Sequence, residues 1–145
     1  MATLTKDKYR VLENTGVHPS YNEHPAVADD IIYGGAAVTL NASGEARPLT
    51  VADTANGFAG FCDEHCDNAG GAAGAKRVKV KEMGRVKLAV VGASSAANVN
   101  DPVYATDDDT FTLTASGALQ IGKVGRWVSG TTCMVDFEAT HRRSI

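Results

Sequence analysis

The spacing of short apolar segments between turn residues constrains the fold of this 145-residue chain more than any other feature. From residue 29 onward, about nine such segments follow one another at intervals of roughly 8 to 12 residues, which is typical of a β-sandwich or a barrel. The expected strands are 31–40, 46–51, 57–63, 78–81, 85–91, 99–106, 111–114, 119–128 and 132–139. We therefore predict an all-β fold, with a compact β-barrel-like or β-sandwich domain over residues 29–145.

The composition agrees with strands rather than helices. Val outnumbers Leu 15 to 7 and there are 13 Thr, and β-branched side chains pack well on pleated strands. Ala and Gly contribute 22 and 15 residues, so the expected core is thin. Charged residues make up 21% and hydrophobic residues 43% of the chain, a balance that excludes a highly charged disordered chain.

The most basic segment is residues 76–87, and it overlaps a predicted hairpin with strands at 78–81 and 85–91 and a turn at 82–84. In its first strand Arg77, Lys79 and Lys81 alternate with valines, which predicts a cationic outer face. That face either stays solvated and discourages edge pairing, or contacts an acidic patch on a protein partner. We expect no nucleic-acid partner, because the segment contains no aromatic residue for base stacking.

Residues 1–28 are predicted to form an extended N-terminal arm. They show little apolar periodicity, and their two His-Pro steps favour extended backbone. The arm nevertheless carries apolar side chains that a solvated tail does not need: Leu4, Tyr9, Val11, Leu12 and Tyr21. Two interpretations stay open, an arm that orders against a neighbouring subunit and a terminus that packs on its own domain. The first predicts that deleting residues 2–25 abolishes partner binding and leaves the domain folded.

Three cysteines are too few for a disulfide framework, so reduced thiols are expected. Cys62, His65 and Cys66 lie close enough in sequence to suggest zinc, but the second pair of ligands that structural zinc sites use is missing. We therefore expect no metal and no cofactor. A Cys62–Cys66 disulfide is an alternative, and the favoured interpretation is one buried and one exposed thiol.

Catalytic chemistry is not expected either. All four histidines fall in predicted arm, loop or tail positions, and no nucleophile motif is present, so we predict no catalytic residues and no enzyme activity. The acidic segment 105–110 lacks the calcium-loop pattern and is expected to be a solvated turn. The longest apolar run, residues 88–91, is far below the roughly 20 residues of a membrane span, and no signal peptide is apparent, which favours synthesis in a cytoplasm and no membrane partner.

The order of several segments resembles the capsid cement, or head decoration, proteins of tailed bacteriophages. The resembling segments are Gly35–Val38, Gly57–Asp63, Val78–Leu88, Val99–Asp108, Ile121–Gly125 and Cys133–Glu138. Each is weakly specific alone, and their order carries the resemblance, which covers the chain from residue 31 onward. The arm is longer than the short lead-in typical of that family.

The resemblance implies a structural virion protein, made in the host bacterial cytoplasm, that stabilises an expanded phage capsid. It would sit on the outer capsid surface as a homotrimer and bridge subunits of the major capsid protein. The interface residues would then be Leu4, Tyr9, Val11 and Tyr21 of the arm and Arg77, Lys79 and Lys81 of the basic strand. A small carbohydrate- or ligand-binding β module is the alternative, and an enzyme of a trimeric β fold ranks third.

Overall fold

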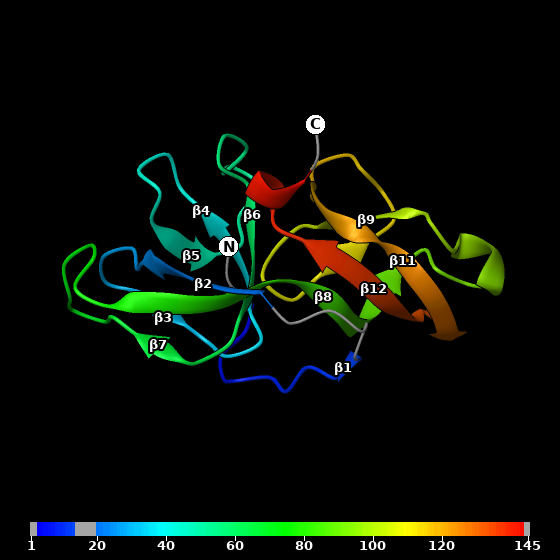
Figure 1. The fold of residues 1–145 in the computed structure, drawn as a ribbon, viewed down its shortest axis with the longest axis horizontal. Coiled ribbons are helices and arrows are strands. Elements are labelled where there is room, and N and C mark those ends of the chain that lie inside the picture. The colour runs from blue at the N-terminus through cyan, green and yellow to red at the C-terminus, as the bar shows by residue number, and fades with distance from the viewer. Residues whose placement is uncertain (1–2, 14–19, 144–145) are drawn as a thin grey trace.

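The computed structural model describes residues 3–13 and 20–143 and is almost entirely β (Figure 1). Its strands are β1 (Leu12–Glu13), β2 (Ser20–Pro25), β3 (Ile31–Ile32), β4 (Ala37–Leu40), β5 (Ala46–Pro48), β6 (Phe58–Cys62), β7 (Cys66–Asp67), β8 (Arg77–Val91), β9 (Pro102–Ala105), β10 (Phe111–Thr112), β11 (Leu119–Ser129) and β12 (Thr132–Glu138). Two short 3-10 helices, η1 (Ala96–Asn98) and η2 (Thr140–Arg142), complete the described elements.

Five strands close into a barrel, which confirms the predicted all-β barrel class. The strand order is β8, β12, β11, β9 and β10, and β10 then pairs in parallel with β8 to close the wall at Phe111 and Val90. In Figure 1 the strands β9, β11 and β12 lie to the right and β2 to β5 and β7 lie to the left, while β8 runs across the middle from one part to the other. The left part continues from β8 through β6 and β4 to β5.

Strand β8 belongs to both parts, and the hairpin predicted for residues 78–91 is wrong. Its 15 residues run unbroken through the expected turn at 82–84. Met83 and Gly84 pair with Glu138 and Phe137 of β12, so the chain stays extended where local sequence suggested a reversal. The predicted alternation is correct, because Val78 and Val80 are fully buried whereas Arg77, Lys79 and Lys81 are not.

The barrel core is built around four phenylalanines. The rings of Phe58, Phe61 and Phe137 meet edge to face with centroids 4.9–6.4 Å apart, and Phe111 packs on Phe61 at 6.0 Å. The spacing of three between Phe58 and Phe61 predicts opposite faces unless the strand is bulged, and the register between β4 and β6 does shift at this point. Gly60 permits the bulge with φ of +132°, so both rings enter one core.

The described parts of the N-terminal arm pack on their own domain. β2 pairs with residues 77–83 of β8, and β1 pairs with Val86 and Arg85 of the same strand. Of the two interpretations above, packing on the domain therefore holds for residues 3–13 and 20–25, while a contact with a neighbouring subunit stays a prediction. Deleting residues 2–25 would strip β8 of two partners, so that deletion is no longer expected to leave the domain intact.

Candidate interaction face

The start of the arm is bound to the acidic turn at residues 107–109. The carboxylate of Asp108 accepts hydrogen bonds from the backbone N–H of Thr3 at 2.7 Å and of Leu4 at 3.4 Å. The hydroxyl of Thr3 reaches the same oxygen at 3.0 Å. Asp108 is fully buried, so the prediction of a solvated turn is wrong for this residue. The turn is covered because it satisfies donors of a segment that precedes it by about 100 residues in sequence.

Asp109 holds the next part of the arm through two cations. Lys8 Nζ lies 3.0 Å and Arg10 Nη2 lies 2.7 Å from Asp109 Oδ1. The Arg10 side chain is only 9% exposed, and its Nε donates to the carbonyl of Gly35 at 2.9 Å. Its guanidinium lies 5.5–5.6 Å from the ring centroids of Phe111 and Phe61, within cation–π range. Arg10 thus covers the edge of the aromatic core.

The arm backbone approaches the domain closely at Gly35. The N–H of Lys8 donates to the carbonyl of Gly34 at 2.8 Å, and a Cβ atom at Gly35 would lie 2.0 Å from the Lys8 carbonyl oxygen. Only glycine fits there, and its φ of +88° also favours glycine. Further along, the carbonyl of Val11 accepts from the N–H of Lys87, so the arm joins β8 just before β1.

The first described part of the arm, residues 3–13, ends in ion pairs. Glu13 of β1 contacts Arg126 at 2.8 Å and Arg85 at 3.1 Å. These hydrogen bonds, from Arg126 first and Arg85 next, lower the pKa of Glu13 to about 2. Arg85 is also bound by Asp136 of β12, so β1, β8 and β12 share one charge network on the barrel surface.

Between these anchors the arm exposes large apolar side chains. Tyr9 is 88% exposed, and Val11 and Leu12 are exposed as well. Leu4 differs, because it is half-buried and packs against the second core cluster, around Val38, in its own domain. Of the predicted arm residues, Tyr9 and Val11 are therefore open to a partner and Leu4 is turned inward.

The structure brings Tyr21 of β2 onto the basic strand. In register, Tyr21 lies opposite Lys81, and the ammonium groups of Lys79 and Lys81 lie 4.9 and 5.5 Å from its ring centroid. Asp63 lies 3.8–3.9 Å from both ammonium groups, so their charge is partly balanced. Arg77 is exposed at the start of β8, opposite Pro25 and away from this group.

An open pocket of about 490 Å³ connects the arm to the basic strand. Tyr9 and Leu12 of the arm line it together with Lys81, Asp63 and His65. Because Tyr21 also contacts Lys81, the exposed arm residues and the partly exposed lysines of β8 lie on one surface. We call it the arm face, and it consists of Tyr9, Leu12, Tyr21, Lys79 and Lys81.

A buried carboxylate that the sequence analysis missed secures β2 beside this face. Glu82 of β8 is 3% exposed, and its oxygens accept from Asn22 at 2.8 Å, His141 at 2.9 Å, and Ser20 and Arg142 at 3.3 Å. It therefore joins β2 and the C-terminal helix η2 to β8. An acidic residue at an inward position of a strand was the available signal, and the assignment of 82–84 to a turn concealed it.

The thiols do not form a site. Cys62, Cys66 and Cys133 are all free and all buried, so the prediction of one exposed thiol at 62 and 66 is wrong. Burial raises the pKa of the Cys62 thiol to about 12. His65 lies outside on the surface, where its Nδ1 bonds to Asp7 at 2.8 Å. Among residues 3–13 and 20–143, no group of three or more His, Cys, Asp or Glu side chains is placed to hold a metal ion.

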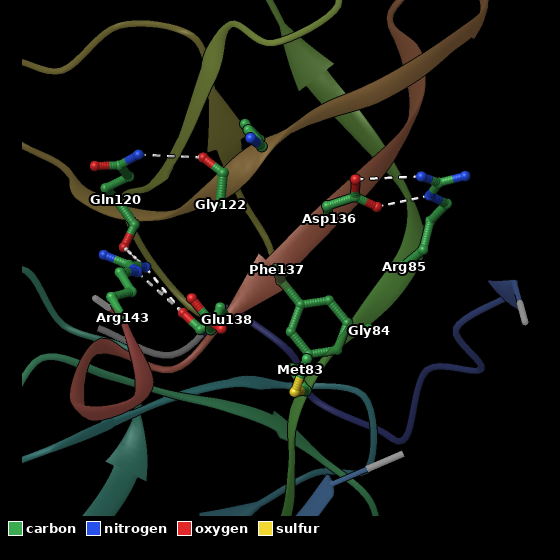
Figure 2. A pocket seen from close by; sticks show the side chains of 10 residues that line it. Met83, Gly84, Arg85, Gln120, Gly122, Asp136, Phe137, Glu138 and Arg143 are labelled. Carbon is green, nitrogen blue, oxygen red and sulfur yellow. Dashed lines mark hydrogen bonds and ion pairs between the residues drawn. The ribbon is translucent and has the colours of Figure 1, made fainter. Parts of the chain in front are cut away.

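A second pocket, of about 400 Å³, lies over β8, β11 and β12. Figure 2 shows that its polar groups already bind one another. Arg85 pairs with Asp136 at 2.6 Å, and Arg143 donates to the backbone carbonyls of Gln120 and Glu138 at 2.6–3.2 Å. These contacts hold the C-terminal segment against the barrel, and none of the residues predicted to form an interface lines the pocket.

No family model, no curated protein and no solved structure matches the chain. Within the part of the chain that the structure describes, no helix is long and apolar enough to cross a membrane.

Proposed function

We propose that this protein is a capsid decoration protein, which binds the outer surface of an expanded phage capsid and bridges subunits of the major capsid protein. The order of segments that resembles the cement family motivates the proposal. The observation that carries it in the structure is the arm face, where two exposed tyrosines and an exposed leucine from separate segments meet two lysines.

The chemistry of the arm face suits a protein partner. Tyrosines combine a large apolar area with a polar tip, and they are enriched among the residues that carry binding energy in interfaces. Lys79 and Lys81 pair with Asp63 only at 3.8–3.9 Å, so an acidic group on a coat subunit could bind them more closely.

Stabilisation requires no chemical step. A homotrimer would present three arm faces and gain avidity from simultaneous contacts with several coat subunits. Binding to the expanded lattice alone would stabilise that lattice by linkage, because a ligand favours the state to which it binds.

Sedimentation with undecorated, expanded capsids tests the proposal, after light scattering has given the solution mass of the protein. We expect a trimer that pellets with capsids at saturating, stoichiometric occupancy. A monomer that stays in the supernatant would refute the proposal and favour the ligand-binding module, for which a glycan screen would follow.

Variants of the arm face make the test specific. The double variant Tyr9→Ala/Tyr21→Ala should weaken capsid binding at least tenfold, since both side chains are exposed and their loss disturbs little of the fold. The control is Val91→Ala/Val99→Ala, which removes exposed apolar groups outside the arm face. Lys79→Glu/Lys81→Glu should weaken binding most at low salt, because salt screens the attraction between these partly exposed lysines and acidic groups of the partner. Equal binding by the two double alanine variants would show that the arm face is not the contact.

A further inference from the structure

The acidic turn and the arm together point to a positioning function. We infer that Asp108 and Asp109 act as a clamp that orders residues 3–13 in the free protein, so that the arm face is preformed before a partner binds. The ordering itself needs no partner, and its consequence for capsid binding rests on the proposed function.

The direction of Tyr9 follows from its two neighbours. Side chains alternate along an extended chain, so when residues 8 and 10 point one way, residue 9 points the other. Lys8 and Arg10 both reach Asp109, at 3.0 and 2.7 Å. Tyr9 therefore faces solvent, where it is 88% exposed at the rim of the pocket that Lys81 also lines.

Anchors on both sides leave this stretch little freedom. Toward the N-terminus, Asp108 binds the backbone N–H groups of Thr3 and Leu4. Toward the C-terminus, the carbonyl of Val11 accepts from Lys87, and Leu12 pairs with Val86. Between them, the Lys8 backbone lies against Gly34 and Gly35. The contacts thus recur every few residues along the arm.

Preformation matters because binding is weakened by the entropy lost when flexible groups become ordered. A clamped arm has lost that entropy on folding, so the partner meets Tyr9 and Leu12 already in place. Asp109 would then control affinity without touching the partner, since its carboxylate is engaged by Lys8 and Arg10.

Hydrogen exchange of the free protein, followed by mass spectrometry on peptides that cover residues 3–13, tests the clamp. In the wild type we expect the Lys8 amide, which donates to Gly34, to exchange at least tenfold more slowly than in an unfolded peptide. Asp109→Ala should raise exchange in this segment at least tenfold while peptides from β11 and β12 stay protected. Asp67→Ala, which removes an exposed carboxylate that accepts from the N–H of Ala69, is the control.

A second pair of variants tests the arm position without altering charge. Gly35→Ala places a Cβ atom 2.0 Å from the Lys8 carbonyl oxygen, whereas Gly44→Ala meets nothing within 4 Å at a similar φ of +77°. Both add backbone strain, so a faster exchange of residues 3–13 in Gly35→Ala alone would report displacement of the arm.

The outcomes separate the clamp from the proposed function. Exchange of wild-type residues 3–13 at the unfolded rate, or equal protection in wild type and Asp109→Ala, would overturn the clamp whatever the capsid result. A protected wild-type arm that is released in Asp109→Ala would support it. Failure of the wild type to pellet with capsids would refute the proposed function and leave the exchange result to decide the clamp.

Discussion

Replacing Arg10 by alanine is the most informative single change for stability, because this side chain links the arm to the aromatic core. The substitution removes a charged hydrogen bond to the carbonyl of Gly35, which contributes about 1.5 kcal/mol or more, and an ion pair with Asp109. It also removes two cation–π contacts, with Phe61 and Phe111, of about 0.5–1 kcal/mol each. Because such contributions overlap, we expect a loss of about 3 kcal/mol in the free energy of unfolding.

Urea denaturation followed by Trp127 fluorescence measures this loss. With a slope of about 2 kcal/mol/M, the midpoint of Arg10→Ala should fall by about 1.5 M. Arg126→Ala is the matched control, because Arg126 is 53% exposed and binds an arm carboxylate, Glu13, without covering the core. Its loss should stay below about 1 kcal/mol. Similar midpoints for the two variants, or a loss below about 1 kcal/mol for Arg10→Ala, would refute the view that Arg10 completes the core.

Three further changes should have distinct effects. Gly60→Ala should lower the free energy of unfolding, measured by urea denaturation, by more than about 2 kcal/mol, because its Cβ atom would lie 2.2 Å from the Lys81 carbonyl oxygen. The control Gly117→Ala, at φ of +68° with open space around it, should lower it by about 1 kcal/mol. Equal losses in the two variants would contradict the bulge in β6. At pH 8, iodoacetamide should modify Cys62 at least about 100-fold more slowly in the native than in the unfolded protein, because burial raises the pKa of the Cys62 thiol to about 12. Mass spectrometry measures both rates, and equal rates would contradict the burial of this thiol. Burial lowers the pKa of the half-buried His24, so the unfolded chain binds a proton at this residue before the folded chain does, and the free energy of unfolding should fall as pH drops below 6.5. Between pH 7.5 and 5, the urea midpoint of His24→Gln should therefore fall less steeply than that of the wild type. The same dependence of the midpoint on pH in both proteins would exclude this effect.

The sequence predicted what depends on local alternation. Val78 and Val80 face inward as expected, and Val86, Leu88 and Val90 share a buried face of β8. The errors at Glu82 and at the acidic turn share a cause, which is a partner supplied by a distant segment. The sequence predicted a turn at Glu82, but Asn22 and His141 satisfy its buried carboxylate within a strand. It predicted a solvated acidic turn, but the arm covers Asp108 and donates hydrogen bonds to it.

The arm face lay beyond sequence reasoning for a related reason. Its apolar and basic residues were predicted separately, from segments about 60 residues apart, and only the pairing of β2 with β8 shows that Tyr21 lies beside Lys79 and Lys81. The alternation of Lys8, Tyr9 and Arg10 was the available signal in the arm. It could have suggested that two cations bind one acidic group and turn the tyrosine outward.

The same packing decides how the interface should be tested. A deletion of residues 2–25 would remove Tyr9 and Tyr21, but also Arg10 and the strand that pairs with residues 77–83 of β8. Loss of capsid binding would then report unfolding as readily as a lost contact. Point variants at exposed side chains separate the two, because Tyr9 projects from an arm whose anchors lie on either side of it. A segment that resembles a tail in sequence thus acts as part of the domain, and only its outward side chains are free to bind.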